Sequence, residues 1–454
     1  MSSAINPVQI IGGGLAGSEC AYQLARQGID VVLHEMRPQR RTPAHQTDAF
    51  AELVCSNSFR SDDPQHPAGV LKREMEAFSS LVIGSARAAA VPAGGALAVD
   101  RELYAARVSA ALEAEPRIEI RRHEVTKLPE GDVVLATGPL TSEAMSEVLT
   151  SLLGDEYLYF YDAIAPIVDA DSLDTNILFA ASRYGKGSGD DYLNAPLDRE
   201  QYLAFHQAVV EAEVVPLRDF EGKLFFEGCL PIEEMARRGV DTLRFGPMKP
   251  VGLTCPDGTR PYAVVQLRQE NLARSHYNMV GFQSRMTWGE QKRVLRMIPG
   301  LEKARFERLG QVHRNTFINA PTHLDKQYRL KTLPRLRLAG QITGVEGYLE
   351  SAATGLAIAI YLGLERRGQG IQPLPATTAL GAMARHLTEA PAKNFQPANI
   401  NYGLFEPLEV RLKKRERRKR YAERAGEELL RWMERHGFEP AQSPQAGDVE
   451  AVAG

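Results

Sequence analysis

Two cysteines stand in segments whose composition suits chemistry better than packing. Cys55 lies in FAELVCSNSFRSDD (residues 50–63), where small polar residues follow the thiol and no apolar period is present. Cys229 lies in FFEGCLPIEEMA, just ahead of an expected helix, and a helix N-terminus lowers the pKa of a thiol. Because a thiolate is a nucleophile, both residues are candidates for covalent or acid–base catalysis. The alternative for each is an inert buried cysteine, which is the commoner fate of an isolated thiol.

The other two cysteines are expected to be structural. Cys20 stands among alanines and leucines at helical spacing, and Cys255 lies in the turn-like TCPDGTRPY. The four cysteines are far apart and form no C-x-x-C pair, which excludes a zinc ribbon and argues against a disulfide framework. We therefore expect no metal site and a reducing, cytoplasmic compartment.

The segment shortly before Cys55 predicts a dinucleotide site. PVQIIGGGLAGSECAYQLARQGIDVVLHEMRP (residues 7–38) has the pattern of a strand, a glycine turn, a helix and a second strand. The turn carries G-x-G-x-x-G, and an acid at the end of the second strand is placed to bind ribose hydroxyls. The alternative is a glycine turn that only packs. The expected cofactor-binding residues here are Gly12, Gly13, Gly14, Leu15, Ala16, Gly17, Glu35 and Arg37.

Two later segments favour FAD over NAD as the dinucleotide. VVLATGP (133–139) is a strand that enters a glycine turn at Gly138. LRLAGQITGVEGYLESAATG (336–355) resembles a second flavin-contacting segment, with Gly340, Gly347 and Tyr348 as candidates. No second G-x-G-x-x-G would hold NADPH or NADH separately, so a nicotinamide would visit the flavin transiently. A plain NAD enzyme is the alternative.

The chain is expected to be α/β, with a Rossmann-like FAD-binding domain, an inserted α+β domain and a short basic C-terminal helical segment. Its 454 residues, 44% hydrophobic and 24% charged, are those of a globular protein. One helix is expected over 69–90, and no stretch reaches the ~18 apolar residues of a membrane helix. The expected division is 1–150 and 331–408 for the FAD-binding domain, 151–330 for the insert, 409–437 for the basic helix and 438–454 for a disordered tail.

The basic segment is a candidate RNA-binding surface. RLKKRERRKRYAER (411–424) concentrates positive charge in a chain whose net charge is −3. The alternative is a solvated helix, and membrane binding is disfavoured because no clear apolar face is expected before LLRWM. The candidate RNA-binding residues are Lys413, Lys414, Arg417, Arg418 and Arg420.

Several long phrases together resemble one family. These are GGGLAGSECAYQLARQGIDVVLHEMRP, TPAHQTDAFAELVCSNS, VPAGGALAVDRE, ATGPLTSEA, FGPMKPVGL, VVQLRQE, HRNTFINAP and GVEGYLESAATG. From residue 8 to about 420 the chain resembles the folate- and FAD-dependent tRNA (uracil-5-)-methyltransferases. It departs from the family's usual Gly-Ala-Gly at GGGLAG, in the variable position of the turn.

The resemblance implies a reaction and roles for particular residues. The product would be 5-methyluridine in the tRNA T-loop, with carbon from methylenetetrahydrofolate and hydride from FAD reduced by NADPH or NADH. Cys229 would attack uracil C6, and Cys55 would be the general base or shield the flavin face; the exchanged assignment stays open. His313 would cap the folate pterin, with Arg314 and Asn315 as polar neighbours, and a hydrogen-bonded loop histidine is the alternative.

Other functions compatible with the sequence differ in substrate or in partner. A ribosomal RNA uridine could replace tRNA with the same chemistry. A small-molecule FAD oxidoreductase would account for the glycines but would leave the two thiols and the basic segment without a role. A flavin-containing RNA-modification subunit that needs a partner would usually carry a longer C-terminal domain, so we expect no obligatory protein partner and no membrane association.

Overall fold

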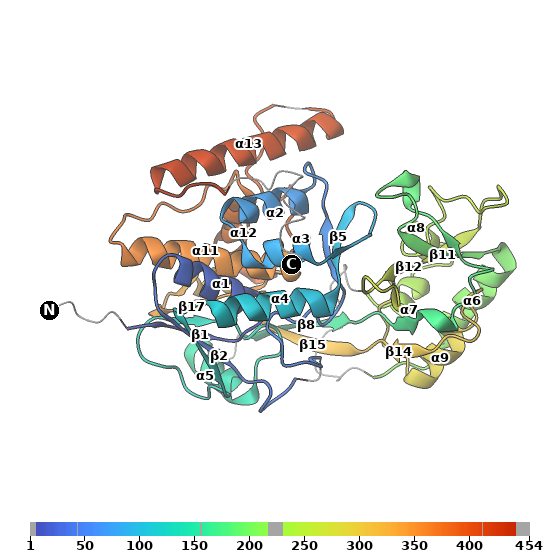
Figure 1. Ribbon diagram of the computed structural model, residues 1–454, viewed down its shortest axis with the longest axis horizontal. Coiled ribbons are helices and arrows are strands. Elements are labelled where there is room, and N and C mark those ends of the chain that lie inside the picture. The colour runs from blue at the N-terminus through green and yellow to red at the C-terminus, as the bar shows by residue number, and fades with distance from the viewer. Residues whose placement is uncertain (1–5, 43, 155–156, 217–229, 411, 442–454) are drawn as a thin grey trace.

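The computed structural model describes residues 6–42, 44–154, 157–216, 230–410 and 412–441. Figure 1 shows two bodies side by side, one built on a mainly parallel sheet and the other formed by a segment inserted into the first. A two-stranded antiparallel ribbon connects them, made by β8 (Tyr157–Ala163) and β15 (Val312–Ile318). This is the α/β architecture with an inserted α+β unit that the sequence predicts.

The parallel sheet of the first body has six strands in the order β16-β17-β7-β1-β2-β6, and β16 alone pairs antiparallel. Its strands are β1 (Val8–Ile11), β2 (Val31–Glu35), β6 (Ile118–Arg122), β7 (Val133–Leu135), β16 (Arg329–Leu330) and β17 (Leu333–Leu338). In β1, Ile10 lies opposite Leu33 of β2 and Val134 of β7. All of β2 and β7 is buried, as expected for parallel strands covered on both faces.

Helices cover this sheet, and a small second sheet lies beside them. The helices are α1 (Leu15–Arg26), α2 (Pro67–Ala77), α3 (Leu81–Ala88), α4 (Arg101–Ala114), α5 (Glu143–Leu153), α10 (Ala320–His323), α11 (Tyr348–Arg366), α12 (Ala379–Glu389) and α13 (Lys414–Arg435). The second sheet is β3 (Ser58–Ser61), β5 (Ala96–Val99) and β4 (Ala90–Val91). Helix α4 begins after Asp100, whose side chain accepts the Leu103 N–H at 3.1 Å.

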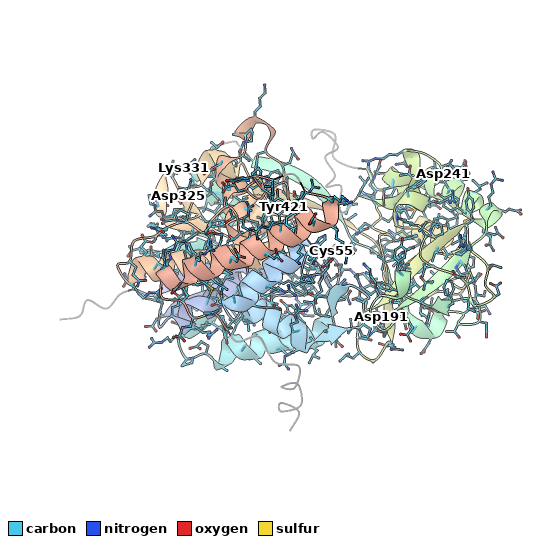
Figure 2. The ribbon with its side chains drawn as sticks, turned by 90° about the horizontal axis from the view of Figure 1, so that it is seen from above. Cys55, Asp191, Asp241, Asp325, Lys331 and Tyr421 are labelled. Atoms are coloured by element: carbon cyan, nitrogen blue, oxygen red, sulfur yellow. The ribbon has the colours of Figure 1, made fainter. Side chains whose placement is uncertain are left out.

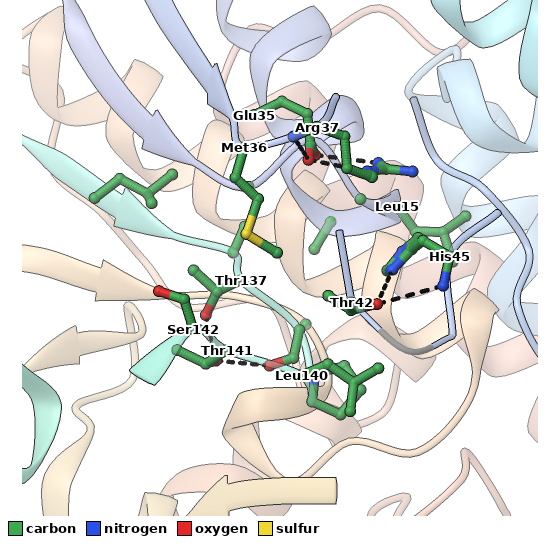
Figure 3. A pocket seen from close by; sticks show the side chains of 18 of the residues that line it. Leu15, Glu35, Met36, Arg37, Thr42, His45, Thr137, Leu140, Thr141 and Ser142 are labelled. Carbon is green, nitrogen blue, oxygen red and sulfur yellow. Dashed lines mark hydrogen bonds and ion pairs between the residues drawn. The ribbon is translucent and has the colours of Figure 1, made fainter. Parts of the chain in front are cut away.

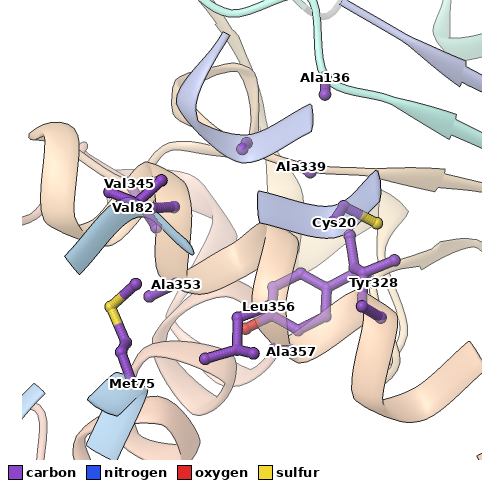
Figure 4. Close-up of a cluster of buried hydrophobic side chains, with 14 of the residues drawn as sticks. Cys20, Met75, Val82, Ala136, Tyr328, Ala339, Val345, Ala353, Leu356 and Ala357 are labelled. Carbon is purple, nitrogen blue, oxygen red and sulfur yellow. The ribbon is translucent and has the colours of Figure 1, made fainter. Parts of the chain in front are cut away.

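The core of this body depends on close contact between α1 and α11. A Cβ atom on Gly355 would lie 2.1 Å from the carbonyl oxygen of Ala16, so only glycine permits this approach. Figure 4 shows Cys20 in the same apolar cluster, near Tyr328. Burial raises the pKa of the Cys20 thiol, which confirms Cys20 as a core residue.

The single helix expected over 69–90 is wrong, because the chain breaks between α2 and α3. Ser79 has a φ of 56°, outside the helical region. Ser80 begins α3 as its N-cap, with its Oγ accepting the Ile83 N–H. The buried carboxylate of Glu19 accepts hydrogen bonds from Ser80 Oγ at 2.8 Å and Val82 N at 2.9 Å. A partner distant in sequence therefore fixes the new helix start.

The inserted body has its own sheet and its own apolar cluster. The strand order is β10-β11-β12-β13-β9-β14. Its elements are β9 (Ile167–Asp169), β10 (Phe179–Ala180), β11 (Tyr192–Leu197), α6 (Arg199–Glu211), α7 (Ile232–Arg237), α8 (Thr242–Phe245), β12 (Ala263–Gln269), β13 (His276–Met279), α9 (Trp288–Leu295) and β14 (Phe306–Arg308). Short 3-10 turns cover Ala170–Ser172 and Arg183–Gly185 here, and Gln341–Thr343 and Ala392–Asn394 in the first body.

Helix α13 lies across α2 on the surface of the first body (Figure 1). Its buried residues include Tyr421, Ala425 and Leu429, spaced by four, so its apolar face starts earlier than the expected LLRWM. Phe438, which the sequence places in a disordered tail, instead packs on Trp432 and Phe78. None of the helices described is long and apolar enough to cross a membrane.

Candidate functional site

A long pocket follows the carboxyl ends of β1, β2 and β7, where open α/β sheets bind ligands. It has a volume of about 1070 Å³, counted with the space open to solvent. Of the predicted cofactor residues, those lining it are Gly12, Gly14, Leu15, Ala16, Glu35, Arg37, Gly138, Gly340 and Tyr348. We call it the dinucleotide pocket, and Figure 3 shows part of its lining.

The glycine turn has the geometry that a dinucleotide pyrophosphate needs. A Cβ atom on Gly12, whose φ is +108°, would lie 2.4 Å from the carbonyl oxygen of Ala136. A Cβ atom on Gly17 would lie 1.9 Å from the carbonyl oxygen of Gly12, so helix and strand touch here. Gly14 faces open space, and α1 begins after it with no side-chain cap, so its first N–H groups are available to phosphate oxygens. The residues present therefore fit FAD.

At one end of the dinucleotide pocket, Glu35 is held by Arg37. Arg37 Nε and Nη2 donate to the two carboxylate oxygens at 2.9 and 3.1 Å, and Gly13 N donates to one of them at 3.0 Å. Burial raises the pKa of Glu35, but the hydrogen bonds and charge of Arg37 outweigh burial and hold this pKa below its ordinary value. Arg37 also pairs with Glu52 at 3.0 Å. Its nearest partners are thus carboxylates, and it orients the acid predicted to bind ribose.

Sequence reasoning missed several side chains of this pocket. His45 Nδ1 lies 2.6 Å from Thr42 Oγ1, and burial together with the charge of Arg37 lowers the pKa of His45 to about 4. On the opposite wall, Thr137 Oγ1 lies 2.7 Å from Thr141 Oγ1. Both pairs are in phrases that carry the family resemblance, TPAHQTD and ATGPLTSEA, which is the signal that could have identified them.

A second pocket adjoins the first at the N-terminus of α11. The two share the lining residues Val54, Pro139, Leu140, Gln341 and Tyr348. We call the second one the thiol pocket, because Cys55 lines it, and its volume is about 1000 Å³ counted in the same way. Its other lining residues are Ala44, Ser56, Ser58, Phe59, Arg60, Ile164, Gln283, Asn315, Glu346, Gly347, Leu349 and Asn399. In Figure 2, Cys55 lies where the two bodies meet.

Tyr348, which lines the dinucleotide pocket, fixes the backbone of the loop that carries Cys55. Its hydroxyl oxygen accepts hydrogen bonds from Cys55 N at 2.5 Å and Ser56 N at 3.1 Å. Burial raises the pKa of Tyr348, and the neighbouring Cys55 raises it further, so the phenol stays neutral. The Cys55 thiol is partly exposed, with its Sγ 3.9 Å from the carbonyl oxygen of Ala163. The loop therefore presents the thiol at the border of the two pockets.

Two arginines hold the carbonyl groups of the same loop. Arg101 donates to the carbonyl oxygens of Leu53 at 2.8 Å and Cys55 at 3.4 Å, and Arg308 donates to that of the intervening valine at 2.9 Å. Arg101 Nε also pairs with Glu270 at 2.6 Å, which joins α4 to the residue that follows β12 in the inserted body. Burial lowers the pKa of Arg101, but Glu270 outweighs this effect and raises it above the ordinary value. Residues from both bodies thus position Cys55.

Of the remaining predicted site residues, some line the thiol pocket and others are not described by the structure. Cys229 lies outside the described residues, as do the side chains of His313 and Arg314 on β15. Asn315 is 3% exposed and lines the thiol pocket. Gly347 lines that pocket as the residue before α11.

The sequence predicts a structural role for Cys255 and no metal site. Cys255 lies in a turn closed by the hydrogen bond from Gly258 N to its carbonyl oxygen at 2.9 Å. Among the residues that the structure describes, no group of three or more His, Cys, Asp and Glu side chains could hold a metal ion.

The predicted RNA-binding residues lie at the start of α13. Lys413 is its N-cap, and all residues from 413 to 420 are exposed. In Figure 2, α13 runs across the first body toward the border where Cys55 lies. The basic turns are therefore on the same side of the molecule as the junction of the two bodies.

The sheet, the glycine turn and the long pocket at the strand ends define an α/β dinucleotide-binding protein of the FAD type. The family model described as glucose inhibited division protein A matches residues 7–370. The chain therefore belongs to the glucose inhibited division protein A family, and its curated relatives confirm the resemblance seen in the sequence.

Two of these relatives are methylenetetrahydrofolate–tRNA-(uracil-5-)-methyltransferases named TrmFO. The protein of Geobacter sulfurreducens is 58% identical over 428 residues, covering 94% of this chain and 98% of the relative. That of Myxococcus xanthus is 53% identical over 451 residues, covering 98% of each chain. Among solved structures, GidA of Aquifex aeolicus matches with a TM-score of 0.66 at 16% identity, covering 96% of this chain and 77% of GidA. At that identity the structural likeness supports the fold.

Proposed function

We propose that this protein is a folate- and FAD-dependent tRNA methyltransferase that makes 5-methyluridine in the T-loop. The observation that carries the proposal is a thiol-lined pocket continuous with a dinucleotide pocket, in a chain 58% identical to a methyltransferase of that name. The reaction would need a site for FAD, a neighbouring site large enough for a folate and a base, and nucleophilic or basic side chains there.

The cofactor would be held by the residues of the dinucleotide pocket. The glycine turn and the first N–H groups of α1 would bind the pyrophosphate, and Glu35, oriented by Arg37, would bind the ribose. When bound and reduced by NADPH or NADH, FAD supplies the hydride that converts the transferred carbon to a methyl group. Tyr348 and Gly340 would border its ring end, because the pocket meets the thiol pocket there.

Two thiols would do the covalent and proton-transfer chemistry on uracil. Carbon C5 is a poor nucleophile, and addition of a thiolate to C6 makes C5 enolate-like and able to attack a one-carbon electrophile. We propose Cys229 as the group that adds to C6 and Cys55 as the group that removes the C5 proton or covers the cofactor face. The exchanged assignment uses the same atoms. Removal of the C5 proton would expel tetrahydrofolate and leave an exocyclic methylene on the ring. Hydride addition to this methylene would complete the methyl group, and expulsion of the thiolate from C6 would restore the pyrimidine ring.

The folate would lie in the thiol pocket, where its pterin can approach the ring end of the cofactor. Asn315 lines this pocket and offers an amide for the pterin edge. We keep His313 and Arg314 as its proposed neighbours, with His313 as the cap over the pterin.

A tRNA with 5-fluorouridine at the target position would test both the function and the thiol roles. The C6 thiolate adduct can form and accept the carbon, but no proton is present at C5 to be removed, so enzyme and RNA remain covalently joined. We expect this adduct, dependent on methylenetetrahydrofolate, with wild type and Cys55→Ser but not with Cys229→Ser. The reverse pattern would show the exchanged assignment.

A matched control is Cys255→Ser, since Cys255 lies in a turn outside both pockets. It should form the adduct as wild type does. An adduct in both Cys55→Ser and Cys229→Ser would contradict attack by either thiol.

A further inference from the structure

Arg60 lies in the thiol pocket and has a costly backbone conformation. It belongs to β3, and its φ is +63°, a region that side chains other than glycine rarely occupy. Such strain persists where the surrounding structure holds the backbone in place. Helix α11 supplies part of those surroundings, because Arg60 Nη2 forms an ion pair with Glu350 in the first turn of α11.

The partner carboxylate is fully buried. Glu350 has 0% exposure, and its Oε1 also accepts a hydrogen bond from Ile400 N at 2.8 Å. A buried carboxylate is costly unless it is paired, so this ion pair fixes where the guanidinium lies. The Arg60 side chain is nevertheless 32% exposed. Within the described part of the chain, its Nε and Nη1 have no hydrogen-bond partner, so these donors remain available to a ligand at this pocket-lining residue.

A half-buried histidine, His66, is the N-cap of α2 and follows Gln65, whose carbonyl oxygen and that of Arg418 on α13 both lie at the Tyr402 hydroxyl. Burial lowers the pKa of His66, and the positive charges of Arg60, Arg418 and Lys72 lower it further against the opposing charge of Asp63. Its Nδ1 accepts the Ala68 N–H at 3.2 Å, so in the neutral ring the proton is on Nε2, which can donate to an anion.

The start of α13 is fixed beside this histidine by Tyr402. The Tyr402 hydroxyl donates to the carbonyl oxygen of Gln65 at 2.8 Å and lies 3.3 Å from that of Arg418. Its ring stacks on Tyr421 with centroids 4.6 Å apart. The basic helix and the turn that carries His66 therefore form one rigid surface.

The charges at this helix start serve a purpose other than helix stability. Residues 413–420 hold seven Lys and Arg and a single Glu, all exposed. Positive charge at a helix N-terminus opposes the helix dipole and destabilises the helix. Lys419 and Arg420 lie near Glu423, at 3.6 and 3.8 Å. Neither ion pairs within the helix nor the helix dipole accounts for the remaining positive charge. Binding of a polyanion to this helix start would account for it.

We propose that Arg60, His66 and residues 413–420 form one phosphate-binding track for the tRNA strand that carries the target uridine. Arg60 binds the phosphate next to the uridine whose base enters the thiol pocket, and the strand continues past His66 and Arg418 along the first turns of α13. The inference rests on the proposed function and adds to it the path of the RNA. It also assigns Glu350 as the residue that positions Arg60.

The test is the salt dependence of binding of an unmodified tRNA transcript to the FAD-loaded protein. Replacing Arg60 alone would leave Glu350 buried and unpaired, so the informative variant is R60Q/E350Q, compared with E350Q. We expect E350Q, which keeps the Arg60 guanidinium but no longer fixes where it lies, to bind tRNA more weakly than wild type with an unchanged salt slope. R60Q/E350Q should bind about tenfold more weakly, and its slope of log K against log salt should be shallower by roughly 0.7–0.9, the value for one phosphate.

The outer part of the track is tested by R417Q/R418Q, whose exposed side chains on α13 can change without unfolding the protein. It should flatten the slope by about two phosphates. The control is R117Q, which changes an exposed arginine that pairs with Asp30 and lies just before the edge strand β6, and it should bind as wild type does. Melting temperature and flavin content are measured for every variant.

Unchanged salt slopes in R60Q/E350Q and R417Q/R418Q would overturn the track. Weaker use of methylenetetrahydrofolate by R60Q/E350Q with unchanged RNA binding would also overturn it, since Arg60 would then serve a folate carboxylate. These failures are distinct from failure of the proposed function, in which the wild-type protein itself makes no 5-methyluridine.

Discussion

At the scale of single residues, hydrogen bonds from several side chains fix the backbone of the short loop that carries Cys55. The N–H groups of Cys55 and Ser56 both donate to the Tyr348 hydroxyl oxygen. Arg101 and Arg308 donate to carbonyl oxygens of the same loop. The sequence pointed to Cys55 because the segment has no apolar period. It could not identify the role of the two arginines, because their partners on this loop are main-chain atoms, although Arg101 lies in the family phrase VPAGGALAVDRE.

Tyr348→Phe should slow methylation more than it destabilises the fold. The substitution leaves two loop N–H groups without their acceptor, which costs about 1–3 kcal/mol and lets Cys55 move. We expect turnover per FAD-loaded molecule to fall about ten- to a hundredfold, as loss of catalytic positioning does. Single-turnover methylation kinetics and thermal unfolding measure the two effects.

A matched control exists in the same helix. Tyr361 is buried, and its hydroxyl accepts the Leu374 N–H at 3.0 Å, outside both pockets. Tyr361→Phe should lower the melting temperature similarly and leave turnover per FAD-loaded molecule unchanged. Equal losses of turnover in the two variants would contradict a positioning role for Tyr348.

At the scale of elements, some helices and strands follow from their local sequence pattern, and others have limits set by contacts with residues distant in the sequence. The β1–α1–β2 unit follows from its own sequence, since the glycine turn and apolar strands need no outside partner. The break between α2 and α3 does not, because Glu19 on α1 supplies its hydrogen bonds. Likewise, the apolar face of α13 is formed by Tyr421, Ala425, Leu429 and Met433, which are four residues apart within a segment dominated by charge.

Trp432→Ala should detach α13 while leaving the cofactor site intact. Trp432 is 1% exposed, donates from Nε1 to the Gln372 carbonyl oxygen at 3.0 Å and stacks on His436. Truncation of a buried aromatic side chain costs about 3–5 kcal/mol. Here the loss would weaken the packing of α13 against the first body. We expect limited proteolysis near residues 408–413 and weaker tRNA binding, with flavin content unchanged.

Leu430→Ala is the control for this helix, because Leu430 is 50% exposed on the same element. It should resist the protease and bind tRNA as wild type does. Loss of FAD from Trp432→Ala would contradict a purely peripheral place for α13.

At the scale of the whole molecule, the loop that carries Cys55 lies at the junction of two bodies with separate cores. The Arg101–Glu270 ion pair and the ribbon β8–β15 join those bodies beside Cys55. The fold class and the family were predictable, because the glycine turn and the long shared phrases are local. The relative placement of the bodies was not predictable, since it depends on contacts such as the Arg101–Glu270 ion pair, whose residues are more than a hundred positions apart. The domain limits drawn from composition stay a prediction.

The most direct measurement combines unmodified tRNA, NADPH and methylenetetrahydrofolate deuterated at its methylene group, followed by mass analysis of the nucleosides. We predict 5-methyluridine that carries both deuterons of the folate methylene and one hydrogen delivered by the reduced cofactor. Its formation should require FAD and folate and should not require S-adenosylmethionine. An FAD-loaded, NADPH-reducible protein that leaves the tRNA uridines unmethylated, or a methyl group without deuterium, would contradict the proposed function.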